Sequence, residues 1–215
     1  MKCEKADLKA VFLVISNIEK NGQYPFTTLV VHSCNKKQNV VLFIKKFIPL
    51  YLSQLKNFMA KTPQLYIISG CNGAGKTTAS YTILPEILEC KEFVNADEIA
   101  RGLSPFQPEK VAIEAGKIML KRIDELLKEK TNFAIETTLA SKTYNHTILS
   151  AREKGYNITL IYFWLSSVEL AKERVKKRVL EGGHNIESQV IERRYYAGIK
   201  NLFDIYLPLV DINDL

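Results

Sequence analysis

Short apolar runs separated by amphipathic segments fill the chain from about residue 62 onward. Buried strands are predicted at 65–69 (LYIIS), 92–95 (EFVN), 133–136 (FAIE) and 158–165 (ITLIYFWL). Helices are predicted at 75–84, 108–129, 144–154, 167–181 and 186–206. Strands that alternate with helices indicate an α/β protein whose parallel sheet is covered on both faces.

Residues that favour helix ends mark several of these boundaries. Pro85 is expected to stop the first helix, Pro108 suits the first turn of the second, and Gly155 follows the third. The apolar positions of the second helix recur at helical spacing: Val111, Ala115, Ile118, Met119, Ile123, Leu126 and Leu127. We expect that helix to bury this stripe against the sheet.

The segment after the first predicted strand has the spacing of a phosphate-binding loop. Gly70, Gly75, Lys76 and Thr77 fit the pattern G-x-x-x-x-G-K-[ST]. Such glycines let backbone N–H groups surround phosphate oxygens at a helix N-terminus. We expect Lys76 to reach the β- and γ-phosphates and the Thr77 hydroxyl to hold Mg²⁺. The predicted nucleotide-binding residues are Gly70, Cys71, Asn72, Gly73, Ala74, Gly75, Lys76, Thr77 and Thr78.

Acidic residues follow the next two predicted strands, at the sheet edge where ligands gather. Asp97, in NADE, has three possible roles. It could be the general base for an acceptor hydroxyl, the N-cap of the next helix or a water-mediated magnesium contact. Glu136, in IETT, is costly to bury unless it is paired or bound, and substrate hydroxyl recognition or contact with a magnesium-bound water would explain it. Glu114 lies away from the apolar stripe, so from the pattern alone it is a solvated surface carboxylate.

Arginines flank a glycine turn near the end of the chain. Arg174 and Arg178 lie one helical turn apart, and Arg193 and Arg194 follow the turn at 182–184 (GGH). Two helices joined in this way resemble a lid that closes over phosphates. An arginine from such a lid would stabilise charge on a transferring phosphoryl group, while a solvated helix face is the alternative for some of the four.

Composition narrows the class of partner. The 215 residues carry a formal net charge of +7 but no dense Lys/Arg run interleaved with aromatic residues. This charge favours small substrates with several phosphates over nucleic acid. The 4 cysteines lack CxxC spacing, so they indicate neither zinc nor disulfides and fit a cytoplasmic protein. The apolar runs at 10–15 and 40–44 are too short to cross a membrane.

From Gln64 to Asp211 the chain resembles the zeta-toxin group of P-loop kinases, in the short form found in bacteria. The matching stretches are LYIISGCNGAGKTTAS, EFVNADEIARGLSPFQPE, IEAGKIML, FAIETTL, GYNITLIYFWL, RVKKRVLEGGHNIESQVIERRY and NLFDIYLPLVD. The resemblance implies a three-layer P-loop NTPase fold with a central parallel sheet and a helical lid. The expected strand order is second, third, first, fourth.

The resemblance also implies transfer of a phosphoryl group from ATP, or GTP, with Mg²⁺. The implied acceptor is the sugar 3′-hydroxyl of UDP-N-acetylglucosamine or a related UDP-sugar, and the implied role is that of a toxin with an antitoxin partner. The implied site residues are Asp97 as general base, Glu114, Glu136 and Thr138 with Asp97 at the acceptor, Lys76, Arg178 and Arg194 in catalysis, and Arg193 at the nucleotide.

Two departures from the family pattern alter these expectations. Ala140 stands where the best-known members carry an arginine, so the acceptor preference is expected to differ. The chain ends at Leu215, where the pattern usually continues into another strand, so a sheet lacking an edge strand is expected. The alternatives are therefore a P-loop kinase with another small hydroxyl acceptor, or a catalytically impaired nucleotide-binding module.

Residues 1–60 do not resemble the kinase, so we divide the chain into an N-terminal extension and a kinase domain at 61–215. The pattern in the extension predicts a helix at 6–19, strands at 26–32 and 40–44, and a helix at 50–60. Three explanations stay open: an autoinhibitory appendage over the nucleotide site, a docking or dimerisation element, or a true translation start at Met59.

Overall fold

The computed structural model describes residues 10–16, 29–33, 62–183 and 185–211. In chain order the elements are β1 (Ala10–Ser16), β2 (Leu29–Ser33), β3 (Gln64–Gly70), α2 (Lys76–Glu86), β4 (Glu92–Val94), α3 (Ala96–Leu103), a 3₁₀ turn (Pro108–Val111), α4 (Ala112–Glu129), β5 (Phe133–Thr137), α5 (Tyr144–Glu153), β6 (Asn157–Leu165), α6 (Val168–Leu180), α7 (Ser188–Asn201), a π-helical turn (Leu202–Tyr206) and α8 (Leu207–Asp211). The four strands predicted after residue 62 are all present as β3, β4, β5 and β6.

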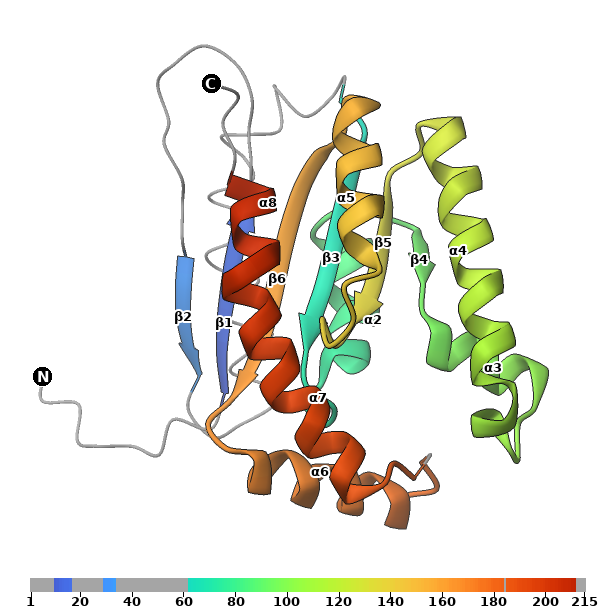
Figure 1. Ribbon diagram of the computed structural model, residues 1–215, viewed down its shortest axis with the longest axis vertical. Helices are drawn as coiled ribbons and strands as arrows, with labels where there is room; N and C mark the ends of the chain where they lie inside the picture. Colours follow the sequence, from blue (N-terminus) through green and yellow to red (C-terminus); the bar gives the residue numbers. More distant parts are fainter. Residues whose placement is uncertain (1–9, 17–28, 34–61, 184, 212–215) are drawn as a thin grey trace, which may run out of the picture.

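A 6-stranded sheet forms the centre of the molecule, in the order β2-β1-β6-β3-β5-β4. The strands β6, β3, β5 and β4 are parallel neighbours, which confirms the predicted order of the four kinase strands. The strands β1 and β2 extend this sheet as an antiparallel pair (Figure 1). The central sheet is therefore parallel in its P-loop part and mixed as a whole.

The predicted helix at 6–19 is wrong, because residues 10–16 form β1. This segment (AVFLVIS) is rich in apolar and β-branched residues, and it pairs with β6 from Ala10 opposite Leu165 to Ser16 opposite Thr159. This segment therefore forms a strand rather than a helix because it pairs with the edge of β6. Because β1 pairs with β6, β6 does not lie at the edge of the sheet, where the expected order of the four strands placed it.

The second N-terminal strand is confirmed in position, since β2 overlaps the predicted range 26–32. The strand expected at 40–44 and the helix expected at 50–60 lie outside the described residues.

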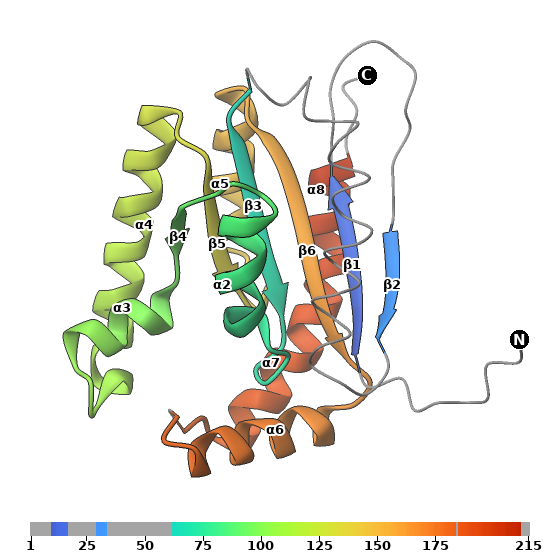
Figure 2. The same ribbon diagram turned by 180° about the vertical axis from the view of Figure 1, so that it is seen from behind.

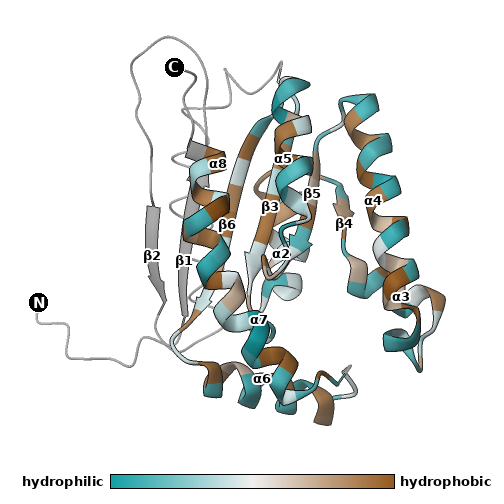
Figure 3. Ribbon diagram, in the orientation of Figure 1, coloured by the Kyte–Doolittle hydropathy of each residue, from teal (hydrophilic) through white to brown (hydrophobic). Residues whose placement is uncertain are grey.

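Helices cover both faces of the sheet, which gives three layers. Successive residues of β3 point to opposite faces, so Tyr66 and Ile68 pack with α2 and α6 in one apolar cluster, while Leu65 and Ile67 pack with α4 and α5 in another. The helices α5, α7 and α8 lie in front of the sheet in Figure 1, and α2 covers the back, seen in Figure 2. The hydropathy colouring of Figure 3 shows brown, apolar residues along β3, β5 and β6.

Three details of the helices differ from the prediction. The helix α2 continues past Pro85 to Glu86, because a proline in the last turn interrupts little of the helix. Ile118 is 39% exposed, so the buried stripe of α4 is narrower than expected. The final helix does not end at residue 206 but continues through the π-helical turn into α8.

Candidate active site

The phosphate loop leaves β3 in a conformation that requires glycine. Gly70 has φ of 135°, and a Cβ at this residue would lie 2.3 Å from the carbonyl oxygen of Phe163 on β6. Gly75, with φ of 85°, precedes α2, and a Cβ there would meet no described atom within 4 Å. The loop is therefore packed against the sheet on one side and open beside the helix N-terminus. An open cradle in that place fits the phosphates of a nucleotide.

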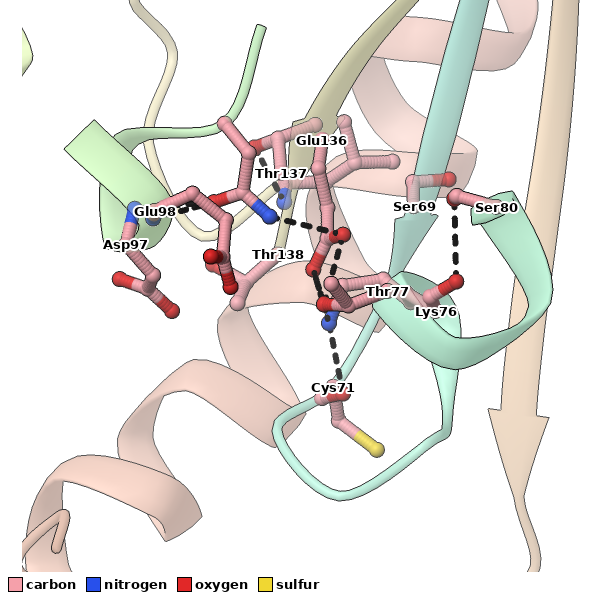
Figure 4. Close-up of polar contacts among 12 residues, drawn as sticks. Ser69, Cys71, Lys76, Thr77, Ser80, Asp97, Glu98, Glu136, Thr137 and Thr138 are labelled. Atoms are coloured by element: carbon pink, nitrogen blue, oxygen red, sulfur yellow. Dashed lines mark hydrogen bonds and ion pairs between the residues drawn. The ribbon is translucent and has the colours of Figure 1, made fainter. Parts of the chain in front are cut away.

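Glu136, at the end of β5, lies at the centre of a polar network (Figure 4). The Thr77 hydroxyl lies 3.0 and 2.9 Å from the two carboxylate oxygens of Glu136, and Asn95 Nδ2 donates to Oε2 at 3.0 Å. Lys76 Nζ lies 3.8 Å from Oε1 and donates to the carbonyl oxygen of Cys71 at 3.0 Å. The network thus connects the phosphate loop with the ends of β4 and β5.

The Glu136 carboxyl group is buried beside the Lys76 ammonium group. Its side chain is only 9% exposed. Burial raises the pKa of Glu136 above the usual carboxyl value, and the Lys76 charge and the Thr77 hydrogen bond oppose this rise. A bound cation would stabilise the charged form of such a carboxylate. The contact with Thr77, the predicted magnesium ligand, therefore favours the magnesium interpretation of Glu136 over recognition of a substrate hydroxyl.

An open cavity of about 440 Å³ lies in front of this network. Its lining residues are Asn72, Lys76, Asn95, Ala96, Asp97, Glu136, Thr137, Thr138, Ala140, Ser141, Tyr144, Arg193, Arg194 and Ala197. The structure thus brings together predicted residues from four elements that are far apart in the sequence. The side chain of Asn72 also fits a ligand, because its Oδ1 is buried without a hydrogen-bond partner among the described residues.

Asp97 lies in the first turn of α3, on the wall opposite Lys76. The N-cap of α3 is Asn95, whose side-chain oxygen accepts from the backbone N–H groups of Asp97 and Glu98 at 2.9 and 3.4 Å. The N-cap interpretation of Asp97 is therefore wrong. Figure 4 shows the Asp97 carboxylate apart from the Lys76–Glu136 pair. Asp97 and Lys76 both line the cavity, so an acceptor bound in it could lie between base and donor.

The wall after β5 holds residues that the sequence did not single out. Tyr144, the first residue of α5, lines the cavity and donates its hydroxyl to Met119 Sδ at 3.4 Å. Burial, and after it the charge of Asp97, raises the pKa of Tyr144, so the hydroxyl stays protonated at neutral pH. Asn95 could have been predicted as the N-cap of α3, since it precedes the segment ADE. No motif in the neighbouring sequence marks Tyr144 or Ser141 as site residues.

Glu114 and Arg178 lie outside the cavity lining, as do the predicted phosphate-loop residues Gly70, Cys71, Gly73, Ala74, Gly75, Thr77 and Thr78. Glu114 is exposed in the first turn of α4. Arg178 is half-buried on α6, and its Cγ lies 2.6 Å from where a Cβ of Gly183 would be. Their roles stay predictions, and His184 lies outside the described residues.

Within the described ranges no group of three His, Cys, Asp or Glu side chains is placed to hold a metal ion. In the same ranges none of the helices combines the length and apolarity needed to span a membrane. Cys71 and Cys90 are buried free thiols, and burial raises the pKa of Cys90 to about 11.

The phosphate loop, its helix and the polar residues at neighbouring strand ends define a P-loop kinase. Residues 50–206 match the sequence model of the family described as Zeta toxin, and the chain belongs to that family. The family match confirms the resemblance seen in the sequence.

Two proteins are similar to this chain in sequence. An uncharacterized protein of Haemophilus influenzae (strain Rd) is 29% identical over 126 residues, which are 59% of this chain and 88% of that protein. A chain of the Pnkp1/Rnl/Hen1 RNA repair complex is 25% identical, with a TM-score of 0.51 over 70% of this chain and 48% of that one.

Two further solved structures share the fold. A chain of the PezAT chromosomal toxin–antitoxin system of Streptococcus pneumoniae is 18% identical, with a TM-score of 0.52 over 74% of this chain and 73% of that chain. A putative kinase from Chloroflexus aurantiacus is 16% identical, with a TM-score of 0.50 over 61% of this chain and 76% of that chain. The three-layer P-loop fold expected from the sequence is thereby confirmed.

Proposed function

We propose that the protein transfers the γ-phosphoryl group of ATP, or GTP, to the sugar 3′-hydroxyl of UDP-N-acetylglucosamine or a related UDP-sugar. In this proposal it is a cytoplasmic toxin whose activity an antitoxin protein, or the N-terminal segment in cis, holds in check. The observation that carries the proposal is the shared cavity, which is lined by Lys76, Asp97, Thr138 and Arg194.

The donor side of the cavity binds and polarises the triphosphate. The backbone N–H groups of the phosphate loop and the Lys76 ammonium face the phosphate position, and α7 adds Arg193 and Arg194 to the same cavity. Arg178 joins them when the turn between α6 and α7 closes over the nucleotide. Thr77 and Glu136 are the residues that would hold Mg²⁺, which offsets negative charge on the phosphates when it is bound.

The acceptor side positions a hydroxyl between Asp97 and the donor. Asp97 accepts the hydroxyl proton while the oxygen attacks the γ-phosphorus and the bond to ADP breaks. Thr138, on the loop after β5, lies on the same wall and binds the acceptor, with Glu136 behind it. Ala140 also lines the cavity, and its small neutral side chain widens the range of sugars that fit.

The proposal is tested with the full chain, ATP, Mg²⁺ and a panel of UDP-sugars, followed by phosphorus NMR. We expect a new phosphomonoester signal, which Asp97→Asn slows by about 10²–10⁴-fold because the general base is lost. Asp124→Asn is the matched control, since Asp124 is exposed on α4 and outside the cavity lining. Binding of ATP without transfer to any acceptor, or full transfer by Asp97→Asn, contradicts the proposal.

A second acceptor, the hydroxyl at an RNA end, is supported by the 25% identity to a chain of an RNA repair complex. The same panel therefore includes an oligoribonucleotide with a 5′-hydroxyl. Transfer to the RNA and to none of the sugars would mean that the acceptor is an RNA hydroxyl rather than a UDP-sugar.

A further inference from the structure

The backbone of α7 lies against residues 138–141, which belong to the loop between β5 and α5 (Figure 1). A Cβ at Gly198 would lie 2.5 Å from the carbonyl oxygen of Thr138. That distance is shorter than any contact a real Cβ makes, and the neighbour is backbone rather than a flexible side chain. Gly198 is therefore required for the observed distance between helix and loop.

Two hydrogen bonds continue the contact along the same helix. Asn201 is buried, and its Nδ2 donates to the carbonyl oxygen of Leu139 at 2.8 Å. The Tyr206 hydroxyl, in the π-helical turn, donates to the carbonyl oxygen of Ser141. Burial raises the pKa of Tyr206 to about 12, so this hydroxyl remains a donor at neutral pH. The loop is thus attached to the helix at residues 138, 139 and 141.

The loop adopts a conformation that its own sequence does not favour. Leu139 has φ of 56°, in the left-handed region that a leucine rarely adopts, and its side chain is fully buried. The backbone N–H of Leu139 donates to Thr137 Oγ1 at 3.0 Å, and that of Ala140 lies 3.4 Å from Thr138 Oγ1. Surrounding structure must maintain such a conformation, and α7 together with the π-helical turn after it supplies contacts on both sides of Leu139.

The same elements form opposite parts of the candidate active site. The loop contributes Thr138 and Ala140 to the acceptor wall, and α7 contributes Arg193 and Arg194 to the donor side. The distance between donor arginines and acceptor wall is therefore set by the contact between helix and loop.

We propose that Gly198 and Asn201 are positioning residues that fix the acceptor wall to the helix carrying the donor arginines. Neither acts on the substrate directly. They keep Thr138 at the distance from Arg193 and Arg194 that in-line transfer requires, since small displacements of reacting groups slow such reactions strongly. This inference rests on the proposed kinase function for its kinetic consequences but not for its structural ones.

Two variants separate the positioning role from general stability. Gly198→Ala adds a Cβ that forces Thr138 away from the helix, and Asn201→Leu keeps the side-chain shape but removes the donor to Leu139. Gly116→Ala is the matched control, because Gly116 also lies within a helix and its added Cβ would meet no described atom within 4 Å.

The first readout is hydrogen exchange of the ligand-free full chain, measured on peptides that cover 138–141. We expect both variants to raise amide exchange there about tenfold relative to wild type and Gly116→Ala. Exchange that matches the control in both variants overturns the inference, whatever the activity of the protein.

The second readout is steady-state kinetics with the acceptor identified in the panel. We expect the acceptor KM to rise and kcat to fall, each about fivefold or more, while ATP affinity stays within about twofold of wild type. Equal losses for ATP and acceptor indicate a general defect and overturn the positioning role. A wild type that transfers to no acceptor contradicts the proposed function alone, and the exchange data then decide the positioning inference.

Discussion

Thr77→Val removes the hydroxyl that holds Glu136 while keeping the shape of the side chain. In the wild type this hydroxyl lies 3.0 and 2.9 Å from the two carboxylate oxygens of Glu136. Because one hydrogen serves both oxygens, the loss counts as one hydrogen bond to a charged group, worth about 1.5–3 kcal/mol. For a chain of this size that corresponds to a fall in Tm of about 3–12 °C.

The assay is urea unfolding at pH 5 and pH 8, with Thr78→Val as control because Thr78 is exposed in the same helix turn. The Thr77 hydrogen bond lowers the pKa of Glu136, so its loss raises that pKa further. Because this hydrogen bond stabilises the charged carboxylate, the destabilisation should grow as pH rises through the pKa of Glu136, and we expect it to be larger at pH 8 than at pH 5. A Thr77→Val variant within about 0.5 kcal/mol of the control at pH 8 would refute the reasoning.

Three further predictions follow from burial and packing. The pKa of Glu136 in the folded protein is raised above 4.5, so the stability of the wild type relative to Glu136→Gln should fall as pH rises from that value. Urea titrations in which the stability difference between the two proteins does not change with pH would contradict this. Gly70→Ala, whose Cβ would lie 2.3 Å from the Phe163 carbonyl, should lower Tm and weaken ATP binding, measured by calorimetry; unchanged affinity speaks against it. Removing residues 1–58 deletes β1 and leaves the edge of β6 unpaired, so size-exclusion chromatography should show self-association rather than a monomer.

The parallel part of the fold was predictable because its signals are local. Each strand from β3 to β6 is a compact, largely apolar run, and the phosphate loop fixes where the first strand ends. The strand β1 was not predictable in this way, since AVFLVIS suits a helix or a strand by itself. What decides its structure is pairing with β6, which lies far away in the sequence.

The residues of the candidate site also differ in whether the local sequence predicts their position. Lys76 and Asp97 follow strands within a few residues, so their approach to one cavity could be expected from strand order. The placement of Tyr144 depends on the turn at Leu139 and on the packing of α7, neither of which a pattern of apolar and polar residues reports. Glu114 was assigned through the resemblance, and the structure places it on an exposed surface.

The central claim is that this cavity transfers a phosphoryl group from ATP to a sugar hydroxyl. The most direct measurement is a proton–phosphorus correlation spectrum of the product formed by the full chain from ATP, Mg²⁺ and UDP-N-acetylglucosamine. The account predicts a cross-peak between the new phosphorus signal and the proton on sugar carbon 3, absent with Asp97→Asn and present with Asp124→Asn. A spectrum in which ATP yields only inorganic phosphate, with no coupling to any sugar proton across the UDP-sugar panel, would contradict it.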